Sequence, residues 1–298
     1  MTSTVSNEAV QLFRSVEVPT QYIEVGEVRY AYRELRPFGL STDTTPLVFL
    51  HRFRGTLDDW DPAFVDAVAQ HRHVILFSDA AVGSSTGSPA TTVDEKAANA
   101  ASFVRALGFD SVDALGFSMG GFVAQALAMN EPALVRKLVL IGTGPGGNPE
   151  TDPPTDLVFQ IALKPDYEFA DVRYLFFAEG RELETQAYIE RQTLRTDREP
   201  LVGPESIQAM VGLILAFMGG ETGHYSKLRE IDAPTLIVNG DDDHFFPVKN
   251  EFLLFRELRD AQLAIYPQAG HAPHQQHPAT VAAQVVRFLD PQGPEASL

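Results

Sequence analysis

The sequence predicts an α/β fold, in which a mostly parallel sheet is flanked by helices and interrupted by an inserted helical segment. Two observations support this prediction. Short apolar runs rich in Val, Ile and Leu alternate with helical patterns, as in a sheet that is buried on both faces. The alternation stops near Gly144 and resumes at Pro234, and the stretch between them has helical patterning without a strong strand.

The expected strands are of two kinds. Thr20–Val25 and Val28–Leu35 alternate polar and apolar residues around Gly26, which is typical of an antiparallel hairpin. Continuous apolar runs predict six more strands: Pro46–Leu50, Val74–Phe77, Val112–Phe117, Leu138–Gly142, Pro234–Asn239 and Gln262–Tyr266. Helical patterns lie between or after them: Asp61–Ala69, Val93–Leu107, Ser118–Asn130, Lys249–Leu258 and Pro278–Leu289.

These elements predict a core domain in two pieces, residues 18–145 and 230–290. The turn-rich stretch Gly144–Pro154 resembles an exit loop from the core. We interpret residues 146–229 as a helical cap inserted between the two pieces.

Composition excludes several classes of partner and chemistry. The net charge of −17 argues against binding to nucleic acid or to an anionic membrane surface, because both need a positive field. The absence of cysteine excludes disulfides and thiolate catalysis. No apolar run approaches the roughly 20 residues of a membrane helix, and Met1–Val16 lacks the apolar core of a secretory signal. We therefore expect a cytoplasmic monomer or homodimer that acts on a small molecule.

The strongest chemical signal is the Gly-x-Ser-x-Gly stretch Gly116–Gly120, which contains Ser118. It lies between a predicted buried strand and a helical pattern, which is the context that favours a nucleophilic serine over a simple capping turn. The serine hydroxyl must project from a sharp, strained turn, so glycines leave room around it. The N–H of Met119, at the start of the helix, is the first expected donor to an oxyanion.

A serine needs a base to take its proton, and the base needs an acid to orient it. The strand Pro234–Asn239 runs into three consecutive aspartates, Asp241, Asp242 and Asp243, any of which is a candidate acid. The last strand runs into Gly270 and His271, and a loop histidine there is the candidate base.

Metal binding is the alternative for the histidines that follow. His271, His274 and His277 recur at a spacing that metal ligands can have. Pro273 and Pro278 disfavour one regular helical face at these positions, so we predict no metal site.

Four stretches together resemble α/β-hydrolases of the esterase, lactonase and cofactor-free haloperoxidase group: Leu47–Pro62, Leu115–Gln125, Asn239–Pro247 and Tyr266–Pro278. The resemblance extends from about Tyr22 to Leu289 and implies an α/β-hydrolase fold with an eight-stranded type of sheet and no cofactor. It also implies a triad in the chain order serine, acid, histidine. By the family's spacing between Gly240 and Pro247 the acid is Asp243, with Asp242 as the second candidate and Asp241 as a turn residue, and the base is His271. The second oxyanion donor falls on Phe53.

Two loops depart from the family's pattern. The family usually has glycine after the histidine that corresponds to His51, whereas this chain has Arg52, which would be strained if that position needed a positive φ. In the loop that begins at Phe77, the family's aspartate and glycine are replaced by Ser78 and Ala81. Both loops border the active site in the family, so the changes indicate either an altered pocket or tolerated drift.

Arg52 and Arg54 allow two interpretations. Arginine suits bidentate recognition of a substrate carboxylate, and Arg54 is the candidate for that role. The alternative is ion pairing with nearby aspartates, namely Asp58, Asp59 or Asp61.

We therefore predict a serine hydrolase that cleaves an ester or lactone of a small, largely hydrophobic molecule by two-step acyl transfer. A carbon–carbon bond hydrolase, a perhydrolase and a non-catalytic ligand-binding relative are the alternatives. The pocket is expected between the carboxyl edge of the sheet and the cap. The expected lining residues, each of which could instead be ordinary core, are Phe53, Met119, Arg54, Phe176, Phe177, Phe217, Met218, Phe245, Phe246 and His274.

Overall fold

The computed structural model describes residues 14–37 and 44–290, so most of Met1–Val16 lies outside the described residues. Eight strands form one sheet in the order β1-β2-β4-β3-β5-β6-β7-β8. The strands are β1 (Gln21–Val25), β2 (Val28–Leu35), β3 (Leu47–Leu50), β4 (Val74–Phe77), β5 (Val112–Phe117), β6 (Val135–Ile141), β7 (Thr235–Gly240) and β8 (Ala261–Tyr266). β2 pairs antiparallel with β1 and β4, and β3 to β8 run parallel, which confirms the predicted fold class.

The bounds of β6 differ most from the prediction. The apolar run begins at Leu138, yet the strand begins at Val135 because Arg136 and Lys137 take part in it. The Arg136 guanidinium pairs with Asp113 at 2.6 Å, and the Lys137 ammonium donates to the carbonyl of Phe288 at 2.7 Å. Local hydropathy places the first residues of β6 in a loop. Partners distant in the sequence allow Arg136 and Lys137 to take part in the strand instead.

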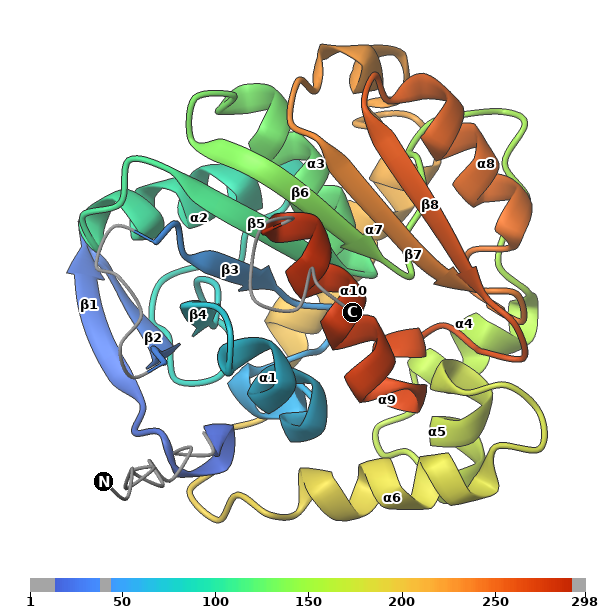
Figure 1. The fold of residues 1–298 in the computed structure, drawn as a ribbon, viewed down its shortest axis with the longest axis horizontal. Coiled ribbons are helices and arrows are strands. Elements are labelled where there is room, and N and C mark those ends of the chain that lie inside the picture. Colours follow the sequence, from blue (N-terminus) through green and yellow to red (C-terminus); the bar gives the residue numbers. More distant parts are fainter. Residues whose placement is uncertain (1–13, 38–43, 291–298) are drawn as a thin grey trace, which may run out of the picture.

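Helices cover both faces of the sheet (Figure 1). Helices α1 (Pro62–Ala69) and α10 (Pro278–Leu289) pack together on one face. Helices α2 (Val93–Ala106), α3 (Met119–Asn130) and α8 (Val248–Glu257) lie on the other. The apolar runs of the central strands are therefore buried on both sides, as their composition indicates.

Four helices lie between β6 and β7 in the chain, where the sequence predicts a cap: α4 (Asp156–Ala162), α5 (Phe169–Phe176), α6 (Glu182–Gln192) and α7 (Pro204–Met218). In Figure 1, α4, α5 and α6 lie along the lower right, toward which the arrowheads of β7 and β8 point. The short elements are η1 (Ser15–Glu17), η2 (Leu57–Asp59), η3 (Tyr225–Glu230) and α9 (Pro273–Gln276). Within the described ranges, no helix is long and apolar enough to cross a membrane.

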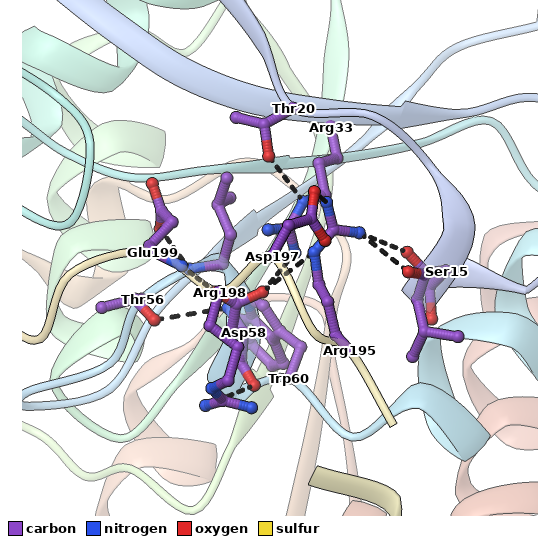
Figure 2. Close-up of polar contacts among 12 residues, drawn as sticks. Ser15, Thr20, Arg33, Thr56, Asp58, Trp60, Arg195, Asp197, Arg198 and Glu199 are labelled. Carbon is purple, nitrogen blue, oxygen red and sulfur yellow. Dashed lines mark hydrogen bonds and ion pairs between the residues drawn. The ribbon is translucent and has the colours of Figure 1, made fainter. Parts of the chain in front are cut away.

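A buried ion network attaches the chain between α6 and α7 to the core (Figure 2). Arg33 on β2 pairs with Asp58 at 2.7 Å, and both side chains are almost fully buried. Arg195 lies 3.5 Å from the same carboxylate and donates to backbone carbonyls near the N-terminal end of the described chain, including that of Ser15. The backbone N–H of Glu199 donates to the second oxygen of Asp58. The return segment of the predicted cap is thus held against the sheet.

Candidate active site

The nucleophile turn, residues Gly116–Gly121, joins β5 to α3. Ser118 has φ 56° and ψ −122°, a left-handed conformation that is costly for a residue with a side chain. Close packing maintains it: a Cβ on Gly116 would lie 2.3 Å from the carbonyl oxygen of Gly120, and one on Gly120 would lie 2.0 Å from that of Leu50. Only glycine fits at these two positions, so the sequence motif reflects backbone contact.

Hydrogen bonds hold the backbone of Ser118 from both sides. Its N–H donates to the carbonyl of Ile141 at 2.9 Å, and its carbonyl accepts from the Thr143 hydroxyl at 2.9 Å. Met119 is the first residue of α3, and the first N–H groups of a helix have no partner within the helix. Its N–H and the dipole of α3 can therefore stabilise a negative charge that develops beside Ser118.

The candidate acid and base form a buried pair. Nδ1 of His271 lies 2.9 Å from Oδ2 of Asp243, and both side chains are at most 1% exposed. Oδ1 of Asp243 accepts the backbone N–H groups of Phe245 and Phe246 at 2.7 and 3.0 Å, so the carboxylate is held in one orientation. An ionised Asp243 places the proton of His271 on Nδ1 and leaves Nε2 as a base.

The structure distinguishes the three adjacent aspartates. The carboxylate of Asp242 is 43% exposed and lies 3.6 Å from the ring of His244. Oδ1 of Asp241 accepts the N–H of Ala269 at 3.3 Å, which suits a turn residue. Of the three, Asp243 is the one whose carboxylate lies within hydrogen-bond distance of His271. The spacing taken from the resemblance therefore selects the aspartate that lies beside the histidine.

A cavity of about 280 Å³ opens beside Ser118 between the sheet and the helical insertion. Five predicted pocket residues line it: Phe53, Met119, Met218, Phe245 and Phe246. The other residues that line it are Phe122, Pro154, Phe159, Ala162, Leu163, Val211, Ile214 and Leu215. Ser118 is the single polar residue among the fourteen, and none of them is charged. The surroundings of the hydroxyl are thus almost wholly apolar.

The structure corrects the other five pocket predictions. Phe176 faces the ring of His271 at 6.3 Å between centroids, and Phe177 packs on Tyr188. Phe217 is fully buried and stacks on Phe122 at 4.2 Å. The remaining two, Arg54 and His274, also lie outside the cavity lining.

His274 occupies an aromatic environment behind the site. It is fully buried and contacts the rings of Phe117 at 4.4 Å and Phe64 at 5.2 Å. Burial lowers the pKa of His274 well below its usual range, and the neighbouring His271 and His51 lower it further. His274 is therefore a neutral packing residue at pH 7. Among the described residues, no group of three or more His, Cys, Asp or Glu side chains could hold a metal.

Helical spacing explains the errors in the predicted lining. The α7 residues that line the cavity, Val211, Ile214, Leu215 and Met218, recur at the i, i+3, i+4, i+7 spacing of one helix face. Phe217 falls outside this spacing and stacks on Phe122, on another side of α7 from Met218. Helical periodicity in the sequence therefore predicts which α7 residues line the cavity, whereas aromatic character does not.

The oxyanion loop, His51–Gly55, carries the second expected donor at Phe53. The N–H of Gly55 donates to the carbonyl of Arg52 at 3.1 Å and closes a turn. The positive φ lies at Arg54, with a value of 59°, and not at Arg52. The expected strain thus falls two residues after the position where the family's glycine is lost.

The two arginines of the oxyanion loop have different partners. Arg52 pairs with Asp59 at 3.2 Å, which supports the ion-pair interpretation for this residue. Arg54 donates to backbone carbonyls at the end of α4, including that of Lys164 at 2.6 Å, and lies 5.3 Å from the ring centre of Tyr167. Neither pairing predicted for Arg54, with a substrate carboxylate or with an aspartate, fits these contacts.

The altered loop after β4 receives a carboxylate from a distant segment. The side chain of Glu199 accepts from the Ser78 hydroxyl at 2.7 Å and from the N–H groups of Ser84 and Leu57 at 2.9 and 3.0 Å. Ala81, where the family has glycine, keeps a φ of 59°. A carboxylate from the α6–α7 connection thus holds the loop at Ser78 and Ser84, and these contacts favour co-adapted loops over drift.

Sequence comparison agrees with this architecture. The sequence profile described as the alpha/beta hydrolase fold matches residues 45–278. The chain belongs to the α/β-hydrolase family. A non-heme haloperoxidase of Rhodococcus erythropolis is 31% identical over 263 residues, which cover 82% of this α/β-hydrolase and 92% of the relative.

Two further relatives show how broad the family is. A 2-hydroxy-6-oxononadienedioate/2-hydroxy-6-oxononatrienedioate hydrolase of Cupriavidus pinatubonensis is 31% identical over 191 residues, 61% of this chain and 63% of that protein. The solved structure of an alpha/beta hydrolase fold protein from Chitinophaga pinensis superposes with a TM-score of 0.84 at 32% identity. The superposition covers 93% of this α/β-hydrolase and 99% of that chain. These relatives thus support hydrolase activity.

Sequence reasoning overlooked one buried acid of this α/β-hydrolase. Glu251 on α8 is fully buried, and neither carboxyl oxygen has a hydrogen-bond partner in the part of the chain that the structure describes. Burial raises the pKa of Glu251 well above its usual range, and the charge of Asp243 raises it further. A neutral Glu251 is therefore expected near the acid of the pair. In the sequence it lies in an ordinary amphipathic helix, where a glutamate carries no signal of burial.

Proposed function

We propose that this α/β-hydrolase is a serine hydrolase that cleaves the ester or lactone bond of a small, uncharged, largely hydrophobic molecule. The observation that carries the proposal is the position of Ser118 as the one polar group in an otherwise apolar cavity. A carbonyl compound bound there has one nucleophile available, and its substituents contact only apolar side chains.

The first half of the reaction is transfer of the acyl group to Ser118. Nε2 of His271 takes the hydroxyl proton as Oγ attacks the carbonyl carbon. The N–H groups of Met119 and Phe53 donate to the oxyanion, and Asp243 stabilises the imidazolium. The imidazolium then gives its proton to the departing alkoxide, so the alcohol leaves and an acyl-enzyme remains.

The second half repeats these roles with water. His271 takes a proton from water as its oxygen attacks the acyl carbon, and the same two N–H groups hold the new oxyanion. Collapse of the intermediate returns the proton from His271 to Oγ of Ser118 and releases the carboxylic acid. Apart from the proton of the attacking water, the side chains of Ser118 and His271 supply every proton acceptor and donor that the two steps need.

The uncharged lining argues for an uncharged substrate. The name of the Cupriavidus relative describes a dicarboxylate, and two carboxylates in this cavity would have no cationic partner among the lining residues. An unpaired buried charge typically costs about 2–5 kcal/mol. This contrast favours ester or lactone cleavage over carbon–carbon cleavage of such acids.

A substrate panel with product identification tests the proposal. Neutral 4-nitrophenyl esters, aliphatic lactones and a 2-hydroxy-6-oxo-dienedioate are compared by kcat/KM and by mass spectrometry of the products. We expect acid plus alcohol from the neutral esters, and at least about 30-fold lower kcat/KM for a matched ester that carries a free carboxylate. Cleavage of the dienedioate alone would refute the proposal, and peracid formed when hydrogen peroxide is added would indicate a perhydrolase.

Matched variants test the catalytic assignment. Ser118→Ala should lower kcat by about a millionfold, while binding of a neutral ester, measured by calorimetry, persists. Asp243→Asn should lower kcat on the order of 10⁴-fold, because His271 loses the acceptor that orients it. Asp242→Asn removes the exposed neighbouring carboxylate and should leave kcat within about twofold. Equal losses in the two aspartate variants would contradict the assignment, and unchanged turnover in Ser118→Ala would indicate that another group is the nucleophile.

A further inference from the structure

Arg52 stands where the resembling family has glycine. The oxyanion loop does not need glycine at this position, because the positive φ lies at Arg54. Arg52 can therefore carry a side chain without backbone strain there, and the N–H of Arg52 donates to Nδ1 of His51 at 2.7 Å. The position is free to take a role that glycine could not have.

The Arg52 side chain is buried and directed back onto its own loop. The side chain is 10% exposed. Nη1 donates to the carbonyl of Phe53 at 2.8 Å, and Nη2 donates to Oδ1 of Asp59 at 3.2 Å. The guanidinium carbon lies 5.0 Å from the ring centre of Phe176, a residue of α5. One cation thus connects the carbonyl of Phe53, the end of η2 and a helix of the insertion.

Two hydrogen bonds fix the peptides on either side of the Phe53 Cα. The peptide before Phe53 is held through the carbonyl of Arg52, which accepts the N–H of Gly55 at 3.1 Å. The peptide after it is held through the carbonyl of Phe53, which accepts from Arg52. Since a trans peptide is planar, the N–H of Phe53 points opposite to the carbonyl of Arg52. Both peptides beside the Phe53 Cα are therefore fixed.

The turn needs this support because it contains a strained residue. Arg54 has a left-handed φ of 59°, which costs conformational free energy for a residue other than glycine. Without the bond from Arg52 to the carbonyl of Phe53, the peptide between Phe53 and Arg54 could rotate and relieve the strain. Such a rotation would change ψ of Phe53 and φ of Arg54 and so disturb the turn that carries the Phe53 N–H.

We propose that Arg52 is a positioning residue that aligns the Phe53 N–H as an oxyanion donor. The inference rests on the proposed function, since it concerns the donor of that reaction. Arg52 acts through Phe53 and lies outside the residues that line the cavity. Its effect should therefore fall on the charged transition state and spare the binding of the neutral substrate.

The test compares Arg52→Gln and Arg52→Lys with the wild type on a neutral 4-nitrophenyl ester. In Arg52→Gln we expect kcat to fall about 10- to 100-fold, up to the typical effect of losing one oxyanion donor, while KM changes less than about threefold. The Kd of phenylboronic acid, which forms a tetrahedral anion on a nucleophilic serine, should rise by a similar factor. Arg52→Lys keeps one cationic donor and should recover part of both losses.

Arg72→Gln is the matched control for the loss of a buried guanidinium. Arg72 is buried and pairs with Asp113 at 2.6 Å, and neither residue lines the cavity. This variant should lower the thermal midpoint yet leave kcat and boronate affinity within about twofold.

Two outcomes would overturn the inference. The first is a kcat within twofold of wild type in folded Arg52→Gln, or in Arg52→Lys if only that variant folds. The second is a lower kcat together with an unchanged Kd for phenylboronic acid. Failure of the wild type to hydrolyse any neutral ester would instead refute the proposed function. A wild type that hydrolyses such esters and an equally active Arg52→Gln would refute the positioning role alone.

Discussion

The nucleophile turn and the oxyanion loop each contain a non-glycine residue with a positive φ. The two segments hold this unfavourable backbone conformation by different means. Ser118, with φ 56°, is held by backbone packing around Gly116 and Gly120. Arg54, with φ 59°, lies in a loop held by side chains that reach other parts of the molecule. The nucleophile turn relies on glycines, whose missing side chains let the backbone pack closely. The oxyanion loop relies on hydrogen bonds from long cationic side chains.

This difference affects how each loop tolerates change. Close backbone packing leaves no room for a side chain at Gly116 and Gly120, so the nucleophile turn is recognisable in the sequence as a short glycine motif. Side-chain anchors can be exchanged for others that reach the same carbonyls, so the oxyanion loop can depart from its family's pattern and still hold Phe53.

The largest expected effect is that of Gly120→Ala on the nucleophile turn. The new Cβ would lie 2.0 Å from the carbonyl oxygen of Leu50 and 2.8 Å from that of His51, and backbone cannot move aside as a side chain can. We expect a loss of more than about 4 kcal/mol in the free energy of unfolding, measured by urea denaturation. A variant within about 1 kcal/mol of wild type would show that the turn is not backbone-packed. Gly212→Ala, on a helix where a Cβ meets nothing within 4 Å, is the control.

The next effect concerns pH, because the oxyanion loop contains a titratable residue. Burial lowers the pKa of His51 well below its usual range, and the Arg52 charge lowers it further. The unfolded chain thus binds a proton near pH 6.5 that the folded chain excludes, so stability is complete above pH 6.5 and falls as the pH drops below it.

His51→Asn should remove this dependence while it keeps an acceptor for the N–H of Arg52. Between pH 6.5 and 5.5 the wild type should lose about 1 kcal/mol more unfolding free energy than the variant. Urea denaturation at both pH values measures this. Burial also lowers the pKa of His274 well below its usual range in the fold, so this residue takes up a proton on unfolding in both proteins and its contribution cancels in the comparison. Equal losses would show that His51 stays protonated in the folded state.

A smaller effect, on thermal stability, should separate two properties of Arg54: its strained backbone and its side-chain hydrogen bonds to the end of α4. Arg54→Ala removes the contacts to α4 and keeps the left-handed strain, whereas Arg54→Gly removes both. We expect Arg54→Gly to be more stable than Arg54→Ala by about 1 kcal/mol in thermal denaturation. If Arg54→Ala were the more stable of the two, the left-handed conformation would not be strained.

The smallest expected effect is on kcat in Phe53→Ala. The donor is the backbone N–H, which alanine retains, so kcat should stay within about threefold of wild type while KM rises through loss of apolar contact in the cavity. Initial rates on a neutral ester separate the two constants. A fall of kcat beyond about 30-fold at unchanged KM would indicate that the side chain itself is needed to shape the donor.

Much of the fold could be predicted from local patterns. The predicted bounds of β2, β4, β5 and α10 match the structure, because polar–apolar alternation, continuous apolar runs and helical periodicity are properties of neighbouring residues in the sequence. The start of β6 could not be predicted, since Arg136 depends on Asp113 from another strand. The same limit applies to Glu199, whose partners lie more than a hundred residues away in the chain.

The candidate site divides in the same way. Ser118 and His271 could be found from the sequence alone, because a strand-to-helix turn and a glycine-preceded loop histidine are short local signals. Asp243 could be chosen from three adjacent aspartates only through the spacing of the resembling family. Its contact with His271 came from the structure, as did the cavity lining on α4 and α7. The partners of Arg52 and Arg54 also came only from the tertiary structure. The physical reason is that a motif records what the backbone needs locally, whereas burial and partnership arise when distant segments pack together.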